Sequence, residues 1–399
     1  MTNWKETTLG EIVEIIDGDR GLNYPKNDEF FDDEFCLFLN TKNVPNTEFS
    51  FSERMFINEE KDLRLRKGKL KRGDFVLTTR GTIGNFAYFS KSIPFDNIRI
   101  NSGMVILRAK ESLDKDFLNF YLKSHFFKEQ TVSLSSGTAQ PQLPIKDLKY
   151  FQILLPPIEE QKEISRVLSS LDDKIELLRE ENKTLEATAQ TIFKEWFVNF
   201  NFPSADGKPY KSSGGKMMDS ELGEIPEGWR VGRLSNIAQV DWGNTNLTKA
   251  SYVPSGEFLA VSAAGCDGRI DSKEYDFGVV VISAIGEYCG RLFFPMEAFT
   301  AIKNTLIVKE LDSETSYFTY FGLKIWKLER RGAAQPFLSK GDTEKMEIII
   351  PVRSILNNFR EFANTVFQKI RSNNSQIETL STLRDTLLPK LMNGDIRLS

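Results

Sequence analysis

Cysteine and histidine are scarce in this sequence of 399 residues, which has three cysteines and one histidine. Cys36, Cys266 and Cys289 lack the Cys-x-x-Cys spacing of zinc sites and disulfide frameworks, so we interpret them as small core residues. No cysteine, histidine or carboxylate cluster stands at ligand spacing around His125, which we interpret as a structural residue. The sequence therefore predicts no metal site.

The motifs of common catalytic sites are missing as well. The chain has no G-x-x-x-x-G-K-S/T phosphate loop, no G-x-G-x-x-G, no H-E-x-x-H and no G-x-S-x-G elbow. The glycine segments at residues 81–84 and 286–288 fit hairpin or strand-end turns better than phosphate cradles. Asp172 and Asp173 could belong to a nuclease site, but they lie within a heptad pattern and fit its solvated face better. The sequence thus predicts a chain that is not an enzyme and binds no cofactor itself.

Neither an excess of one charge nor a long apolar run is present. Lysine and arginine total 52 against 56 aspartates and glutamates, so the net charge of −4 gives no general attraction to nucleic acid, and such binding would need local patches. Residues 1–5 contain no apolar signal region, and no stretch approaches the ~18 apolar residues of a membrane span. We expect a cytoplasmic protein without membrane contact.

The sequence does contain a heptad pattern, and it occurs twice. Apolar residues between positions 156 and 197 alternate steps of four and three, interrupted by Asn182, which is typical of a coiled coil. These residues are Ile164, Leu168, Leu171, Ile175, Leu178, Leu185, Ala189, Ile192 and Trp196. An offset of 195 residues leads to a second set, in which Ile377 takes the position equivalent to Asn182. The other members are Phe359, Ala363, Val366, Ile370, Asn373, Leu380, Arg384, Leu387 and Leu391. We predict two long helices that share one seam.

The segments before the two helices repeat as well. Residues 137–143 correspond to residues 332–338 at the same offset of 195. Trp4 and Gly18 correspond to Trp229 and Gly243 at an offset of 225, and the difference implies about 30 additional residues within the first unit. We expect a first globular domain at residues 1–155, a long helix at 156–200, a linker rich in Pro, Gly and Ser at 201–228, a second domain at 229–350, a second helix at 351–393 and a tail at 394–399.

Short runs bounded by Gly, Asn or Lys indicate strands within both globular domains. One helix is expected around residues 116–123 in the first domain and around residues 316–327 in the second. We predict an α+β fold, with two domains of mainly antiparallel strands plus helices, separated by two long helices that form an antiparallel coiled coil. Short connections favour this antiparallel arrangement, although the linker is long enough for a parallel pair.

Candidate DNA contacts are local. Residues 61–72 hold seven basic residues against one acidic residue, a density suited to phosphate contacts, although a solvated surface helix or hairpin would give the same pattern. Arginine and asparagine near the glycine turns can contact guanine and adenine edges. The candidates of the first domain are Arg64, Arg66, Lys67, Lys69, Lys71, Arg72, Thr79, Arg80, Asn85, Asn97, Arg99 and Asn101. Those of the second are Trp242, Asn244, Asn246, Lys249, Lys303, Asn304, Arg330 and Arg331.

Taken together, these segments make the chain resemble the specificity subunits of type I restriction–modification systems. The resemblance rests on the repeated turn at residues 137–143 and 332–338, on the run LLPPIEEQ at residues 154–161, on the linker at 208–229 and on the tail at 387–396. It spans nearly the whole chain. The sequence departs from the family pattern at residues 350–354, where IPVRS replaces the run before the second helix.

The resemblance implies a non-catalytic DNA-recognition subunit, in which each globular domain reads one half of a bipartite, asymmetric site. Two modification subunits that carry S-adenosylmethionine are expected to dock on the helices and to flip the target adenine, and a restriction subunit is expected to join them. Two rigidly spaced, dissimilar readers would also select a two-part site on physical grounds. A coiled-coil scaffold without a DNA role and a stand-alone DNA-binding protein remain open as alternatives.

Overall fold

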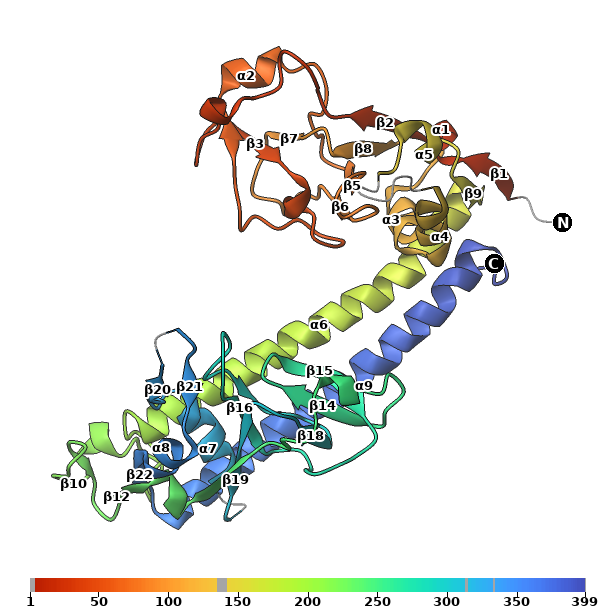
Figure 1. The fold of residues 1–399 in the computed structure, drawn as a ribbon. Helices are drawn as coiled ribbons and strands as arrows, with labels where there is room; N and C mark the ends of the chain where they lie inside the picture. The colour runs from red at the N-terminus through yellow and green to blue at the C-terminus, as the bar shows by residue number, and fades with distance from the viewer. Residues whose placement is uncertain (1–3, 135–141, 313–314, 333, 399) are drawn as a thin grey trace. The chain divides into compact units, whose positions relative to one another are not determined.

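The computed structural model describes residues 4–134, 142–312, 315–332 and 334–398, and the chain divides into two compact units. Unit 1 comprises Met1–Glu176 and Ile377–Ser399, and unit 2 comprises Leu177–Gln376. Two helices of 40 residues each, α6 (Ile158–Phe197) and α9 (Arg353–Met392), contribute residues to both units (Figure 1). They occur where the two heptad patterns predict long helices.

Unit 1 combines two small sheets, a two-stranded ladder and short helices. Its strands are β1 (Lys5–Thr8), β2 (Val13–Asp17), β3 (Cys36–Leu39), β4 (Phe56–Ile57), β5 (Phe75–Thr78), β6 (Phe86–Tyr88), β7 (Ile98–Ile100), β8 (Met104–Ala109) and β9 (Gln152–Leu155). The short helices are α1 (Leu9–Ile12), α2 (Glu59–Arg64), α3 (Lys115–Lys123), α4 (His125–Leu134) and α5 (Ile145–Leu148). The larger sheet has the antiparallel order β2-β8-β5-β6, the smaller has the order β4-β3-β7 with β3 parallel to β7, and β1 pairs with β9.

Unit 2 repeats this topology. Its strands are β12 (Arg230–Arg233), β13 (Ala238–Trp242), β14 (Phe258–Ser262), β15 (Gly265–Ile270), β16 (Val280–Ser283), β17 (Leu292–Phe293), β18 (Phe299–Ala301), β19 (Thr305–Glu310) and β22 (Glu347–Ile350), with helices α7 (Ser316–Leu323) and α8 (Lys340–Lys345). The sheet orders are β13-β19-β16-β17 and β15-β14-β18, the pair β14 and β18 is parallel, and β12 pairs with β22. The expected α+β fold with mainly antiparallel strands is thus confirmed.

Two small hairpins have no counterpart among the described strands of unit 1. They are β10 (Met217–Met218) with β11 (Ile225–Pro226), and β20 (Arg330–Arg331) with β21 (Phe337–Leu338). The second hairpin contains the turn expected at residues 332–338, of which residue 333 lies outside the described residues. In unit 1 most of the corresponding turn, residues 137–141, also lies outside them.

The glycines that repeat between the units occupy equivalent crowded positions. Gly18 follows β2, and a Cβ there would lie 2.1 Å from the carbonyl oxygen of Asn101. Gly243 follows β13, and a Cβ there would lie 2.1 Å from Oγ1 of Thr305. Any larger residue would push this strand end away from the segment that enters β8 or β19, so the backbone approach requires glycine.

Unit 1 packs its domain core against the neighbouring parts of both long helices. Trp4, Phe117, Phe120, Ile164, Leu168, Leu391 and Met392 belong to one buried cluster. Asp172 of α6 accepts ion-pair contacts from Arg384 of α9 at 2.8 Å and from Lys123 of α3 at 3.0 Å. Leu168 of α6 shares a cluster with Leu391 of α9, and Asp172, further along α6, pairs with Arg384, which lies earlier on α9. The helices are therefore antiparallel here, as expected.

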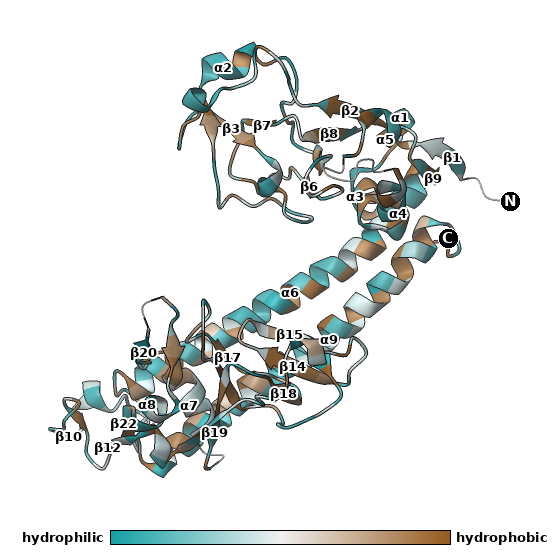
Figure 2. Cartoon of the chain, in the orientation of Figure 1, coloured by the Kyte–Doolittle hydropathy of each residue, from teal (hydrophilic) through white to brown (hydrophobic). Residues whose placement is uncertain are grey.

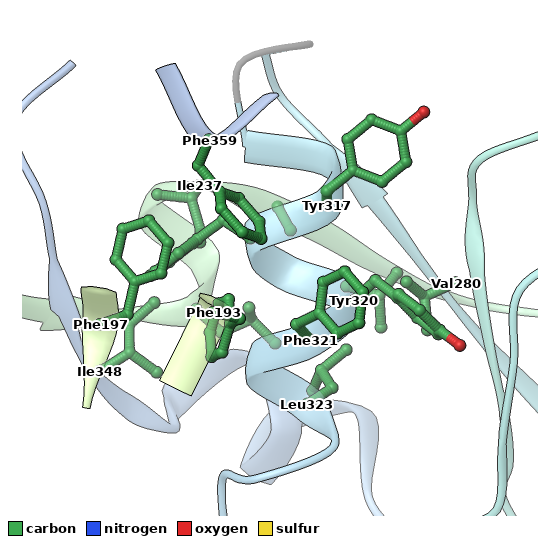
Figure 3. Packing of buried hydrophobic residues seen from close by; sticks show 14 of the residues in the cluster. Phe193, Phe197, Ile237, Val280, Tyr317, Tyr320, Phe321, Leu323, Ile348 and Phe359 are labelled. Carbon is green, nitrogen blue, oxygen red and sulfur yellow. The ribbon is translucent and has the colours of Figure 1, made fainter. Parts of the chain in front are cut away.

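Unit 2 has a core dominated by aromatic rings (Figure 3). Phe197 of α6 packs edge-on against Phe359 of α9, with ring centroids 5.1 Å apart, and Phe193 lies 5.8 Å from Phe321 of α7. Burying each such phenylalanine contributes about 1.5–3 kcal/mol. The antiparallel pairing is confirmed in this unit too, because Asn182 contacts Asn373 while Phe197 contacts Phe359.

The seam residues predicted on the two helices are all buried or half-buried: Ile164, Leu168, Leu171, Ile175, Leu178, Val366, Ile370, Ile377, Leu380 and Leu387. Figure 2 shows hydrophobic and hydrophilic stretches alternating along both helices, as the heptads predict.

Two expectations from the sequence were wrong. Cys266 is exposed, because it lies on β15 at the edge of its sheet. Helix α7 ends at Leu323 and not near residue 327, since the chain turns there and the Trp326 ring packs against Gly322.

Candidate nucleic-acid interface

In unit 1, loops from several strand ends meet on one polar surface, which we call edge 1 and which consists of residues 18–22, 66–68, 79–81 and 101–103. Thr79 donates from its amide and its hydroxyl to the carbonyl of Gly103, at 2.9 and 3.1 Å. Gly68 packs against Gly18, and Arg20 donates to the carbonyl of Ser102 at 3.3 Å. These contacts hold the four segments together.

Asp19 organises edge 1 from beneath. Its buried carboxylate accepts hydrogen bonds from the backbone amides of Arg20 at 2.8 Å and Arg66 at 2.7 Å, and from the Arg66 guanidinium at 3.2 Å. Burial by itself raises the pKa of Asp19, but the hydrogen bonds from Arg66 and Arg20 outweigh burial and hold that pKa below its ordinary value. The carboxylate therefore stays charged at neutral pH and fixes both arginines beside the loop.

The basic run at residues 61–72 is less available than its composition suggests. Helix α2 covers only its beginning, and the remainder is turns and loops. Arg64 pairs with Glu60, and Lys69 pairs with Asp62. Arg72 donates to the carbonyls of Ser90, Ile93 and Phe95, pairs with Asp96 at 2.7 Å and lies over the ring of Phe89. Most of this charge is thus neutralised within the chain.

Arg99 is the most occupied of the candidates. It is 6% exposed, pairs with the buried Asp62 and donates to the carbonyls of Asp62, Leu65 and Lys67. These contacts fasten the loop that follows α2. Arg66, Lys67, Lys71 and Arg80 are exposed, and the last three form no ion pair within the described part of the chain.

The remaining candidates of unit 1 are mostly engaged in backbone contacts. Thr79 is buried and bonded as described above. Asn85 donates to the carbonyls of Val44 at 3.1 Å and Pro45 at 2.7 Å. Asn101 accepts from the amide of Gly103 at 2.9 Å, and Asn97 is half-buried. Of the predicted set, Arg66, Lys67, Thr79, Arg80 and Asn101 therefore lie on edge 1.

Unit 2 presents an equivalent surface, edge 2, formed by residues 242–247, 284–286, 302–304 and 336–337. The amide of Asn244 donates to the carbonyl of Ala301 at 2.8 Å, and that of Ala284 donates to Asn304 at 2.9 Å. Trp242 is 42% exposed, and Asn246, Lys303 and Asn304 are exposed as well. Asn304 has a left-handed φ of 72°, a conformation that asparagine tolerates better than most residues. The side chain of Asn244 is occupied within the chain, since its side-chain amide donates to Glu274 at 2.6 Å.

Three other candidates of unit 2 lie elsewhere. Lys249 pairs with Asp267. Arg330 and Arg331 lie on β20, where they line a cleft rather than edge 2, and Arg331 pairs with Asp342 at 2.8 Å. The fold brings Trp242, Asn246, Lys303 and Asn304 together on edge 2, whereas Lys249 pairs with Asp267.

Sequence reasoning missed some basic side chains at both surfaces. Arg20 lies on edge 1, and its only signal was its position two residues after the repeated Gly18. Arg233, Lys327 and Lys345 line the cleft of unit 2, and no local run of basic residues in the sequence marked them because they come from three separate elements.

No cluster of three potential metal ligands occurs in the described ranges, and no helix there combines the length and apolar character that a bilayer crossing requires. His125 is exposed and lies 3.1 Å from Glu129.

Comparison with known proteins points to one family. A family model described as the type I restriction modification DNA specificity domain matches residues 1–187. The specificity subunit of the type I restriction enzyme MjaIX from Methanocaldococcus jannaschii is 27% identical over 436 residues, which cover 100% of this chain and 97% of the relative. The HindI specificity subunit from Haemophilus influenzae is 25% identical over 473 residues, with coverage of 99% and 100%.

A solved structure shares the fold. The crystal structure of the S subunit of a type I restriction–modification system from M. genitalium superposes with a TM-score of 0.57 at 15% sequence identity, and covers 98% of this chain and 96% of that one. At this identity the likeness concerns the fold, with its two β-rich domains and two long antiparallel helices.

Proposed function

This chain belongs to the specificity subunits of type I restriction–modification systems, the non-catalytic components that recognise the DNA target, and we propose that each of its two domains reads one half of a bipartite, asymmetric sequence. One observation carries the proposal: the two units have the same strand order but different side chains at equivalent edges. Edge 1 offers Arg20, Arg66 and Arg80, whereas edge 2 offers Trp242, Asn246, Lys303 and Asn304. Two domains with the same strand order but different exposed polar side chains would select different base sequences.

The two kinds of contact fall to different residues. Arg80 is exposed and unpaired among the described residues, and a guanidinium can bond O6 and N7 of guanine at once. Asn246 and Asn304 can contact adenine edges in the same bidentate way. Arg66, Lys67 and Lys71 suit phosphate contacts, which position the domain without reading bases. Arg72 and Arg99 instead hold the loops in place through their own chain.

The long helices have a second role in the proposal. They set the gap between the half-sites and dock two modification subunits, which would carry S-adenosylmethionine, and a restriction subunit would then join. Exposed leucines on the helices support the docking, since Leu177 of α6 is 61% and Leu383 of α9 is 44% exposed. The chain would act in the cytoplasm, where the chromosome is accessible.

A domain exchange tests the proposal. Residues 1–155 would be replaced by the first domain of a relative with a different target, and methylated adenines would be mapped by single-molecule sequencing in cells with the whole system. One half of the methylated sequence should change and the other should persist. A change in both halves, or in neither, would reject independent reading. Methylation without any defined sequence would favour a scaffold, and sequence-specific binding without methylation would favour a stand-alone DNA-binding protein.

A further inference from the structure

Unit 2 contains a wide cleft with an unusual charge balance. Its volume is about 1440 Å³, and its wall is formed by residues from β12, the β16–β17 turn, the segment after α7, β20, α8 and β22. Three acidic side chains line it, Glu329, Asp342 and Glu347. Six basic side chains face them: Arg233, Lys324, Lys327, Arg330, Arg331 and Lys345. We call this surface the basic cleft.

Two of the six cations are neutralised within the chain, and four are not. Lys324 pairs with Glu186, and Arg331 pairs with Asp342. Arg233, Lys327, Arg330 and Lys345 are exposed and form no ion pair among the residues that the structure describes. Elsewhere in unit 2 exposed cations commonly have acidic partners, such as Lys249 with Asp267, Arg269 with Glu297 and Lys273 with Asp276. Four unpaired cations therefore converge on this cleft and raise its local potential.

The wall of the basic cleft strengthens this potential. The Trp326 ring lies in the wall, packs edge-on against Phe318 with ring centroids 5.4 Å apart, and covers Gly322. Low-dielectric walls focus the field of the charges that they carry. The guanidinium of Arg330 lies over Gly290, where a Cβ would be 2.7 Å from Nη2, so this side chain has a defined place at the rim.

The basic cleft adjoins edge 2. Gly290 of the cleft closes the turn between β16 and β17, and Gly286 of edge 2 opens the same turn. The amide of Gly290 donates to the carbonyl of Ser283 at 2.8 Å, and that of Gly286 donates to Pro336 at 2.9 Å. This hydrogen-bonded turn connects the two surfaces, so that one extended polyanion can contact both.

We propose that the basic cleft binds the phosphodiester backbone of the duplex whose bases edge 2 reads, an inference that rests on the function proposed above. A duplex presents a phosphate every few ångströms, which suits several cations spread along a cleft better than one compact anion does. Arginine also matches phosphate oxygens with a bidentate geometry. In unit 1 the segment after α3 forms helix α4 instead, so the two domains would hold their half-sites by different backbone contacts.

The test removes the four unpaired charges from the full-length chain in its complex with the modification subunits. Arg233, Lys327, Arg330 and Lys345 would all be changed to Gln, and binding to a duplex with the mapped target sequence would be measured over a series of salt concentrations. The magnitude of the negative slope of log K against log salt should fall by about 0.9 for each lost phosphate contact, or by about 3–4 in all. Ethylation-interference signals should vanish beside the half-site read by unit 2 and persist beside the other.

A matched control removes four charges from the same unit outside the cleft: Lys194, Lys211, Arg230 and Lys309, which are exposed and form no ion pair among the described residues, would be changed to Gln. Its slope should stay close to that of the wild type. Equal slopes for cleft and control variants would overturn the proposal. An unchanged slope with loss of the modification subunits would also overturn it, and would identify an acidic protein surface as the occupant. If the wild-type complex showed no sequence preference, the proposed function itself would fall, a result that is separate from either outcome.

Discussion

The side-chain amide of Asn373 on α9 donates to Oδ1 of Asn182 on α6 at 2.9 Å, at a fully buried position in the helix pair of unit 2. It also donates to Glu181 at 3.0 Å, and Asn182 donates in turn to Asn374 at 2.8 Å. A polar layer within an apolar seam lowers stability but penalises every other register, because a shifted helix would bury amides without partners. This layer therefore specifies how α6 and α9 align.

Removing one side of this layer should be worse than removing both. Asn182→Leu removes one of the two acceptors of the buried Asn373 side-chain amide, leaves only Glu181, and should lower the free energy of unfolding by about 1–3 kcal/mol. The double change to Leu at both positions should recover that loss or exceed wild-type stability. Urea-induced unfolding followed by circular dichroism measures both. Equal losses in the single and double variants would show that the layer has no such coupling.

Exposed and occupied cations of unit 1 should behave differently. Changing Lys67 and Lys71 to Gln should leave the fold intact and reduce the magnitude of the salt slope of DNA binding by up to about 2, since each lost phosphate contact removes about 0.9. Fluorescence anisotropy over a salt series measures the slope. A slope equal to that of the wild type would show that these two lysines face solvent and make no phosphate contact.

Arg99→Gln should act on stability. Asp62 is 1% exposed and would keep Lys69 but lose its buried guanidinium partner, and three carbonyls would lose a donor. The expected loss is about 3–5 kcal/mol in the free energy of unfolding. Thermal and urea unfolding measure it, with Arg64→Gln as the control because Arg64 pairs with Glu60 at the surface. A loss no larger than that of the control would contradict the structural role.

Asp19 gives a pH signature. Its folded pKa is depressed, so its charged form contributes stability above the unfolded value of about 3.9, and that contribution is lost as the pH falls through the folded pKa. Asp19→Asn should therefore destabilise the chain at pH 7, and its difference from the wild type should shrink below about pH 4. Urea unfolding at a series of pH values measures this. A difference that does not change with pH would argue that only the shape of the side chain matters.

The helices should act as a ruler for the gap between the half-sites. A heptad inserted after Glu176 in α6 and another after Gln376 in α9 keep the seam in phase at the points where the units divide. Seven residues add about 10.5 Å, or roughly three base pairs at 3.4 Å each. Methylome mapping should show unchanged half-sites and about three additional unread base pairs. Insertion of seven residues after Gly207 in the linker is the control and should leave the gap unchanged; an unchanged gap in the helix variant would end the ruler hypothesis.

The repeated plan of the molecule was determined by the sequence alone. Heptads predicted α6 and α9, and the pairs Trp4 with Trp229 and Gly18 with Gly243 predicted that two domains share one frame. These signals are readable because they reflect local requirements: a helix face repeats at fixed steps, and a backbone approach of this closeness admits only glycine.

The availability of each charge was decided only by the tertiary structure. Lys69, Arg72 and Arg99 are basic candidates of the first domain, yet Asp62, Asp96 and backbone carbonyls occupy them. Arg233, Lys327 and Lys345 are far apart in the sequence and converge on one cleft without acidic partners among the described residues. The physical reason is that pairing acts through space over a few ångströms, so long-range contacts, and not composition along the chain, determine which cations remain free for a ligand.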